Sequence, residues 1–156
     1  MRLLVDGHNL IGQLPDIHLD DPHDEAKLVE RLRRYRARTR ASIVVIFDGG
    51  VPAGWSADLS GGGIRVVFSR PGVPADALIL RRIRQVRTPR GLTVVTSDAD
   101  VAGAARGRGI RVLPSHEFAA ELDAPPDVKP AEAKSTDVRL SPQEVKEWLS
   151  LFGTEE

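Results

Sequence analysis

Five short runs of apolar residues, separated by longer segments with helical spacing, most constrain what this chain can fold into. Each run is bounded by turn-forming residues, and the runs cover residues 3–5, 43–47, 64–68, 92–96 and 110–113. Short buried strands that alternate with helices are typical of a parallel sheet whose strands are joined by helical crossovers. We therefore expect an α/β fold, a three-layer α/β/α sandwich around a mainly parallel sheet of about five strands.

The segments between these runs predict four helices. Asp21 is suited to be an N-cap and Pro22 to be a first helical residue, so the first long helix is expected to start there. Gly109 is expected to end another helix in the left-handed conformation. The expected helices cover about residues 21–40, 74–87 and 99–108, with a short one from residue 115.

Two segments interrupt the alternation. Residues 49–63 are glycine-rich and long for a connection, which favours a functional loop, although a disordered insertion stays open. Residues 123–139 have the Pro, Ala and Lys content of a linker. Beyond it, Ser141 is suited to cap an amphipathic C-terminal helix within residues 140–156. We expect one domain at residues 1–122, then the linker and the terminal helix.

The composition excludes several classes of site. The chain has no cysteine, so it has neither disulfides, a thiol nucleophile nor a Cys-type zinc site. Its N-terminal residues contain no apolar stretch long enough for a signal peptide or a membrane span. We therefore expect a cytoplasmic protein that does not enter a membrane.

The charges are balanced overall but segregated along the chain. Of 22 basic and 22 acidic residues, the segment from Glu117 onwards holds 4 and 10, which leaves the preceding part at +6. Many of its bases are arginines in runs within residues 31–40 and 81–90. Such runs suit a phosphate-rich partner, and a merely solvated arginine-rich surface is the alternative.

Four aspartates follow a strand end or open the next helix: Asp6, Asp48, Asp76 and Asp98. Ligands of open parallel sheets bind at the carboxyl edge of the strands, so these side chains are expected to converge there, with Asp100 as an additional member. The alternative is local, because Asp76 and Asp98 are also suited to cap helices, and Asp6 and Asp48 to form turns before glycine.

Clustered carboxylates indicate a bound cation. Several aspartates in one crevice repel each other unless a cation offsets their charge, and oxygen ligands favour Mg²⁺ or Mn²⁺ over zinc. Such an ion activates water and stabilises charge on a phosphoryl group, so phosphodiester hydrolysis is the natural reaction. We expect Asp6, Asp48, Asp98 and Asp100 to hold the metal. The arginine runs would then bind the substrate backbone.

Four sequence segments together resemble the NYN domain, specifically its YacP-like branch. They are residues 4–11 (LVDGHNLI), 45–49 (VIFDG), 67–69 (VFS) followed by Ala75-Asp76, and 95–98 (VTSD), in the family's order over about residues 1–122. This resemblance implies a PIN-like Rossmannoid fold and a divalent-metal endoribonuclease that acts on RNA, in some members while ribosomes engage it. His8 replaces the tyrosine expected in the first motif, and the third motif carries a single acid.

By this resemblance the catalytic residues would be Asp6, Asn9, Asp48, Asp76 and Asp98. The residues expected to contact RNA are Arg33, Arg36, Arg40, Arg81, Arg82, Arg84, Trp55 and His8. An aromatic side chain such as Trp55 is suited to stack on a base, and equally to pack on the domain. The terminal helix would dock on the domain, form a homodimer or bind a partner.

Two rival functions stay open. The first is a non-catalytic RNA-binding or ribosome-binding module in which the aspartates are structural. The second is another Mg²⁺-dependent phosphoryl-transfer enzyme, such as a Toprim-like domain, prompted by the Asp98-Ala99-Asp100 sequence. The absence of an Asp-x-Asp motif directly after the first strand counts against this one. No P-loop motif is present, which disfavours an ATPase.

Overall fold

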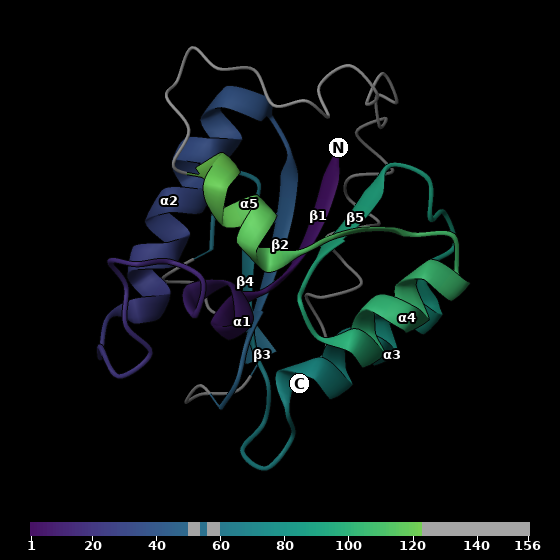
Figure 1. Ribbon diagram of the computed structural model, residues 1–156, viewed down its shortest axis with the longest axis horizontal. Helices are drawn as coiled ribbons and strands as arrows, with labels where there is room; N and C mark the ends of the chain where they lie inside the picture. The colour runs from purple at the N-terminus through teal and green to yellow at the C-terminus, as the bar shows by residue number, and fades with distance from the viewer. Residues whose placement is uncertain (50–53, 56–59, 123–156) are drawn as a thin grey trace.

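The computed structural model describes residues 1–49, 54–55 and 60–122 and shows the expected α/β sandwich (Figure 1). Its sheet has the strand order β3-β4-β2-β1-β5-β6. The strands are β1 (Arg2–Asp6), β2 (Ser42–Phe47), β3 (Gly54–Trp55), β4 (Ile64–Phe68), β5 (Leu92–Val95) and β6 (Arg111–Leu113). Every pairing is parallel except that of β3, a two-residue edge strand antiparallel to β4. The five predicted strands are confirmed, and β3 is an addition that the sequence did not predict.

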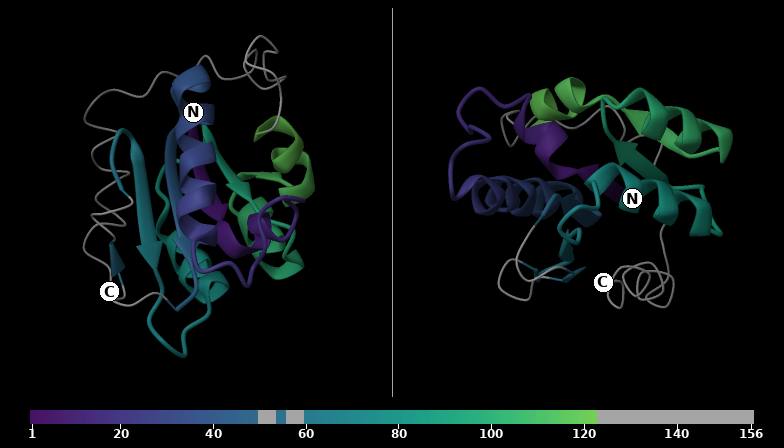
Figure 2. Two further views of the ribbon diagram at one scale, coloured as in Figure 1. Left: turned by 90° about the vertical axis from the view of Figure 1, so that its left-hand side faces the viewer. Right: turned by 90° about the horizontal axis from the view of Figure 1, so that it is seen from below.

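Helices cover both faces of this sheet, as the views from the side and from below show (Figure 2). The helices α1 (Gly7–Ile11), α2 (Asp24–Thr39) and α5 (Ser115–Leu122) pack on one face, and α3 (Ala75–Gln85) and α4 (Ala99–Gly107) on the other. Successive strand residues point to opposite faces, so Leu3 and Val5 of β1 enter the first core and Leu4 the second. The three-layer arrangement follows from strands that are apolar on both faces.

The four predicted helices are confirmed, with a shifted start for the first. That helix begins at Asp24 with His23 as N-cap, two residues later than expected. Asp21 instead accepts the amide of His23 through its side chain and that of Asp24 through its carbonyl, so it stabilises the turn before the helix. Gly109 follows α4 with a φ of +74°, as expected of a residue that ends a helix.

The segment after β1 is a short helix, α1, so the alternative that Asp6 forms a turn before Gly7 is wrong. Gly7 is the first residue of α1 and is buried. A Cβ atom built there would lie 2.3 Å from Cε1 of Phe47, so glycine is needed for the close approach of α1 to the β2 end. The α1 backbone is thereby held directly beside the end of β2.

We expect Gly7→Ala to destabilise the protein by about 1–3 kcal/mol, because the added methyl group collides with a buried ring in a packed core. Chemical denaturation measures the change. Gly103→Ala is the matched control, because Gly103 is also helical and a Cβ there would meet no neighbouring atom within 4 Å. Because alanine has a higher helix propensity than glycine, the Gly103→Ala variant should be at least as stable as wild type. Equal stabilities of the Gly7→Ala variant and wild type would contradict the close-approach role of Gly7.

The topology brings the strand ends and the helix starts to one edge. The strands β1, β2, β4, β5 and β6 are parallel, so their carboxyl ends share an edge, and each crossover helix begins there. None of the helices within the described residues is long and apolar enough to cross a membrane. The predicted linker, the predicted terminal helix, most of residues 49–63 and the Trp55 side chain lie outside the described residues.

Candidate active site at the carboxyl edge of the sheet

Asp6 is the buried carboxylate at the centre of this edge. It is the last residue of β1, is 7% exposed, and accepts a hydrogen bond from the Thr96 hydroxyl at 3.3 Å. Burial raises the pKa of Asp6 to about 6, while the hydrogen bonds from Thr96 and the Asn9 backbone oppose that rise. The negative charges of Asp48 and Asp98 are smaller contributions to the same rise. The structure therefore brings three of the predicted aspartates within electrostatic reach of each other.

Asp48 and Asp98 flank Asp6 and also serve local structure. Asp48 follows β2, and its Oδ1 accepts the amide of Ala75 at the start of α3, while its side chain stays 53% exposed. Asp98 is the N-cap of α4, where its Oδ1 accepts the amides of Asp100 at 2.9 Å and Val101 at 3.0 Å. The capping interpretation of Asp98 is thus correct. One carboxylate oxygen caps the helix, which leaves Oδ2 for another partner.

Asn9 connects three elements at this edge. Its side-chain oxygen accepts the Ser97 amide at 2.8 Å and the Ser115 hydroxyl at 2.6 Å. Because Asn9 lies in α1, this oxygen joins the segment after β1 to the β5–α4 connection and to α5. Asn9 therefore holds the aspartate-bearing segments together, which is a positioning role.

Asp24 is a residue of this edge that the sequence prediction missed. It opens α2, is 3% exposed, and its Oδ2 lies 3.9 Å from Nε2 of His8. On its other side the His8 ring accepts the Asp48 amide through Nδ1 at 3.2 Å. Burial raises the pKa of Asp24, and the nearby His8 opposes the rise. The signal was available, because a crossover helix that follows β1 must begin at the same edge as Asp76 and Asp98.

The oxygen donors at this edge suit a hard cation. Asp6, Asp48 and Asp98 offer carboxylate oxygens, and their mutual repulsion is relieved by positive charge. A second group adjoins them: ligand atoms of His8, Asp24 and Glu25 lie within 4.8 Å of one another, the one group of three so close among the described residues. Because Nδ1 of His8 already accepts the Asp48 amide, this group has fewer open donors. The three aspartates are therefore the better candidate ligands for a cation.

The remaining predicted acids lie at the margin. Asp76 is in the first turn of α3, where its carboxylate accepts the Ala77 amide at 2.9 Å. Asp100 is exposed in the first turn of α4. Neither is among the charges that act on Asp6, so the structure places both beside the central aspartates without joining them to that set.

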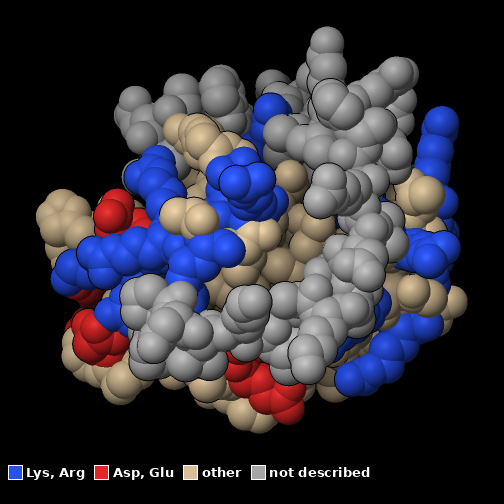
Figure 3. Space-filling model, turned by 90° about the horizontal axis from the view of Figure 1, so that it is seen from above, with Lys and Arg blue, Asp and Glu red and all other residues tan. Residues whose placement is uncertain are grey.

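The predicted RNA-binding arginines lie in the second halves of α2 and α3 or, for Arg40, at the end of α2. Arg33 is nine residues after Asp24, which is about 14 Å along a helix. From the amino edge of the sheet, Lys and Arg side chains gather over α2 on one side and near α3 and α4 on the other (Figure 3). Arg82 differs, because it is 2% exposed and donates to Gln85 at 2.7 Å. An RNA cannot reach this guanidinium, so the expected contact by Arg82 does not fit the structure.

Comparison with known proteins agrees with the resemblance seen in the sequence. The sequence model of the family described as the YacP-like NYN domain matches residues 3–151. Among solved structures, the crystal structure of Rae1 (YacP) from Bacillus subtilis is similar with a TM-score of 0.65 and 24% identity, over 79% of this chain and 74% of that one. A tryptophan-to-leucine mutant of Rae1 gives a TM-score of 0.62 and 24% identity over 78% and 74%. No curated protein matches the chain.

Proposed function

Because this chain belongs to the YacP-like NYN domain family, we propose that it is a metal-dependent endoribonuclease that hydrolyses RNA phosphodiester bonds at the carboxyl edge of its sheet. The family and its PIN-like nuclease fold support a ribonuclease role in general. The observation that carries the proposal is the placement of Asp6, Asp48 and Asp98 at or just beyond the carboxyl ends of the neighbouring strands β1, β2 and β5, where the charges of Asp48 and Asp98 act on the buried Asp6. Ligands of open parallel sheets bind at this edge, and perturbed carboxylates cluster at functional sites.

In this proposal Asp6, Asp48 and Asp98 hold Mg²⁺ or Mn²⁺, with Asp100 at the margin. The bound ion would activate water and offset the charge that develops on the phosphoryl group. Asp76 would be a further ligand or orient the attacking water.

The neighbouring side chains support this set. Asn9 keeps the strand ends in register through Ser97 and Ser115. His8 accepts the Asp48 amide at Nδ1, and its position beside Asp24 and Asp48 makes it a candidate substrate contact.

The proposed partner is RNA, with ribosomes as a possible setting that the family resemblance suggests, and the proposed location is the cytoplasm. Arg33, Arg36, Arg40, Arg81 and Arg84 would contact the RNA backbone, and Trp55 a base. Homodimer formation through residues 140–156 also stays a proposal.

A second candidate is a non-catalytic RNA-binding module on the same fold. The observation that favours it is that both flanking aspartates have structural partners: Asp48 accepts the Ala75 amide, and Asp98 caps α4. If these contacts were their whole purpose, RNA binding would survive chelation and would weaken with salt. The family match gives no support to the Toprim-like alternative.

Cleavage of a labelled structured RNA, and of the same sequence as DNA, separates these functions. With Mn²⁺ we expect the purified protein to cut the RNA internally and to leave the DNA intact, and EDTA should abolish the cleavage because the carboxylates cannot stabilise a phosphoryl group alone. Gel analysis of the products is the measurement. Binding without cleavage under Mg²⁺, Mn²⁺ and added ribosomes would favour the non-catalytic module.

A further inference from the structure

A basic hollow lies at the opposite edge of the sheet from the aspartates. It has a volume of about 250 Å³ and lies between the end of α2 and the glycine turn that precedes β4. Its lining residues are Arg33, Arg36, Ala37, Gly61 and Gly62. None of these described residues is acidic, so this part of the lining carries net positive charge.

Arg36 is held in a fixed position in this hollow. A Cβ atom on Gly63 would lie 1.9 Å from Arg36 Nε, so the guanidinium rests directly against the glycine backbone. The Arg36 Nε is buried and has no hydrogen-bond partner among the described residues. The residue as a whole is partly exposed, and a guanidinium held against a surface loses little further freedom when its exposed part binds a phosphate.

The glycine turn adds backbone donors. Gly61, Gly62 and Gly63 have φ values of 140°, 60° and 89°, a run of backbone conformations that side chains rarely adopt. Gly61 and Ile64 exchange backbone hydrogen bonds at 2.8 and 3.0 Å. The amides of Gly62 and Gly63 donate to no acceptor within the described part of the chain. Successive amides in such a turn form a concavity that binds anions.

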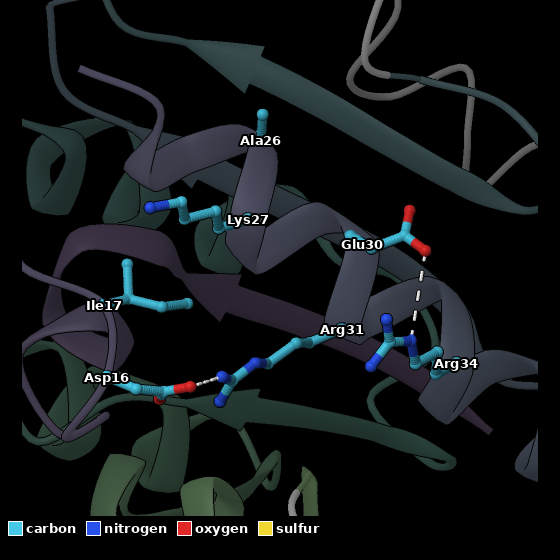
Figure 4. A pocket seen from close by; sticks show the side chains of 7 residues that line it. All are labelled: Asp16, Ile17, Ala26, Lys27, Glu30, Arg31 and Arg34. Atoms are coloured by element: carbon cyan, nitrogen blue, oxygen red, sulfur yellow. Dashed lines mark hydrogen bonds and ion pairs between the residues drawn. The ribbon is translucent and has the colours of Figure 1, made fainter. Parts of the chain in front are cut away.

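A second hollow on α2 shows the contrast. It has a volume of about 460 Å³, and acids within it face its arginines: Arg31 pairs with Asp16, and Arg34 lies 3.9 Å from Glu30 (Figure 4). The lining thus holds two acids beside its two arginines, and its third base, Lys27, pairs with Asp21. Arg33 also lies 4.0 Å from Glu30, and both Glu30 pairs are exposed and contribute little, so the contrast rests on the acids that line the second hollow and on the buried position of Arg36 Nε. The hollow at Arg36 is therefore the better phosphate site of the two.

We propose that the hollow of Arg33, Arg36 and the glycine turn binds one backbone phosphate of an RNA strand, as an anchor remote from the aspartates. The proposal rests on the proposed function in that the strand also reaches the carboxyl edge. Arg36 is twelve residues after Asp24, which is about 18 Å along α2. At about 3.4 Å per stacked nucleotide, this distance corresponds to roughly five nucleotides between the anchor and the aspartates.

The salt dependence of RNA binding tests this anchor. Fluorescence anisotropy with a labelled 12-nucleotide single-stranded RNA in EDTA, over a series of KCl concentrations, gives the slope of log affinity against log salt. Each lost phosphate contact reduces that slope by about 0.7 for a single strand. We expect this reduction for Arg36→Gln and for Arg33→Gln, and no change for Arg34→Gln. The last is the matched control because it removes the same charge from the same helix, outside the hollow.

Unchanged slopes for Arg33→Gln and for a folded Arg36→Gln variant would overturn the anchor. Arg33 is exposed, so its variant keeps the test valid if Arg36→Gln fails to fold. Inorganic phosphate could raise the Tm of the two variants less than that of wild type while their RNA slopes stay unchanged. That result would identify a site for small anions and would also overturn the proposal. Because EDTA prevents metal-dependent cleavage, a changed slope supports the anchor even if the protein proves not to be a nuclease.

Discussion

The Asp6→Asn/Asp98→Asn variant should cut RNA about a hundred- to a thousand-fold more slowly than wild type at saturating Mn²⁺. Asp6 ends β1 and Asp98 follows the neighbouring strand β5, and the charge of Asp98 acts on Asp6. A bound metal contributes several kcal/mol to a phosphoryl transition state, and each 1.36 kcal/mol is tenfold in rate. Single-turnover cleavage of labelled RNA is the measurement, because it isolates the chemical step.

Asp20→Asn is the matched control for this loss. It makes the same chemical change at an exposed loop position and should cut RNA at the wild-type rate. RNA affinity of the double variant in EDTA should be no weaker than that of wild type, because removing carboxylates removes repulsion of the phosphates. Full cleavage by a folded double variant would disprove the aspartate site. Equal losses in affinity and in rate would point to a binding role instead.

Much of this site is predictable from the sequence because the strands are parallel. Residues that directly follow parallel strands lie at the same edge of the sheet. Once residues 3–5, 43–47 and 92–96 were interpreted as parallel strands, Asp6, Asp48 and Asp98 had to lie at one edge. The structure places the three at this shared edge, and the charges of Asp48 and Asp98 contribute to the raised pKa of Asp6, although burial is its main cause. No comparable rule distinguishes a central acid from a marginal one, since that depends on side-chain direction. Asp76 was therefore ranked with the others.

The parts that sequence could not predict depend on tertiary contacts. The helix α1 has five residues, too few for a helical period to be detected, and its glycine looked like a turn former. The reason that position 7 needs glycine is the nearby Phe47 ring, which is forty residues away along the chain. Arg82 was counted with its exposed neighbours because it stands in an arginine run, although the α3 face buries it. Composition shows that arginines are present, while helix phase decides which of them reach solvent.

Asp6→Asn alone should stabilise the metal-free fold by about 3 kcal/mol at pH 8, even though it damages the proposed active site. The pKa of Asp6 rises from 3.8 unfolded to about 6 folded, and each pKa unit corresponds to 1.36 kcal/mol. The folded state therefore binds the proton more tightly, so the wild-type fold loses stability as pH rises from about 4 to 6. Asparagine is never ionised and avoids that loss. The expected gain corresponds to roughly 10 °C in Tm.

Thermal unfolding in EDTA at pH 8 and pH 4 measures this effect. At pH 4 the wild-type carboxyl is almost fully protonated in the folded state, so the advantage of Asp6→Asn should shrink to below about 1 kcal/mol. Mn²⁺ at pH 8 should stabilise wild type and leave the variant unchanged, because the ion binds the ionised carboxylate of the folded state. Asp20→Asn should show neither response. A variant that is less stable than wild type at pH 8 in EDTA would mean that the hydrogen bonds from Thr96 and Asn9 outweigh burial, and that the carboxylate at this edge is there for the fold.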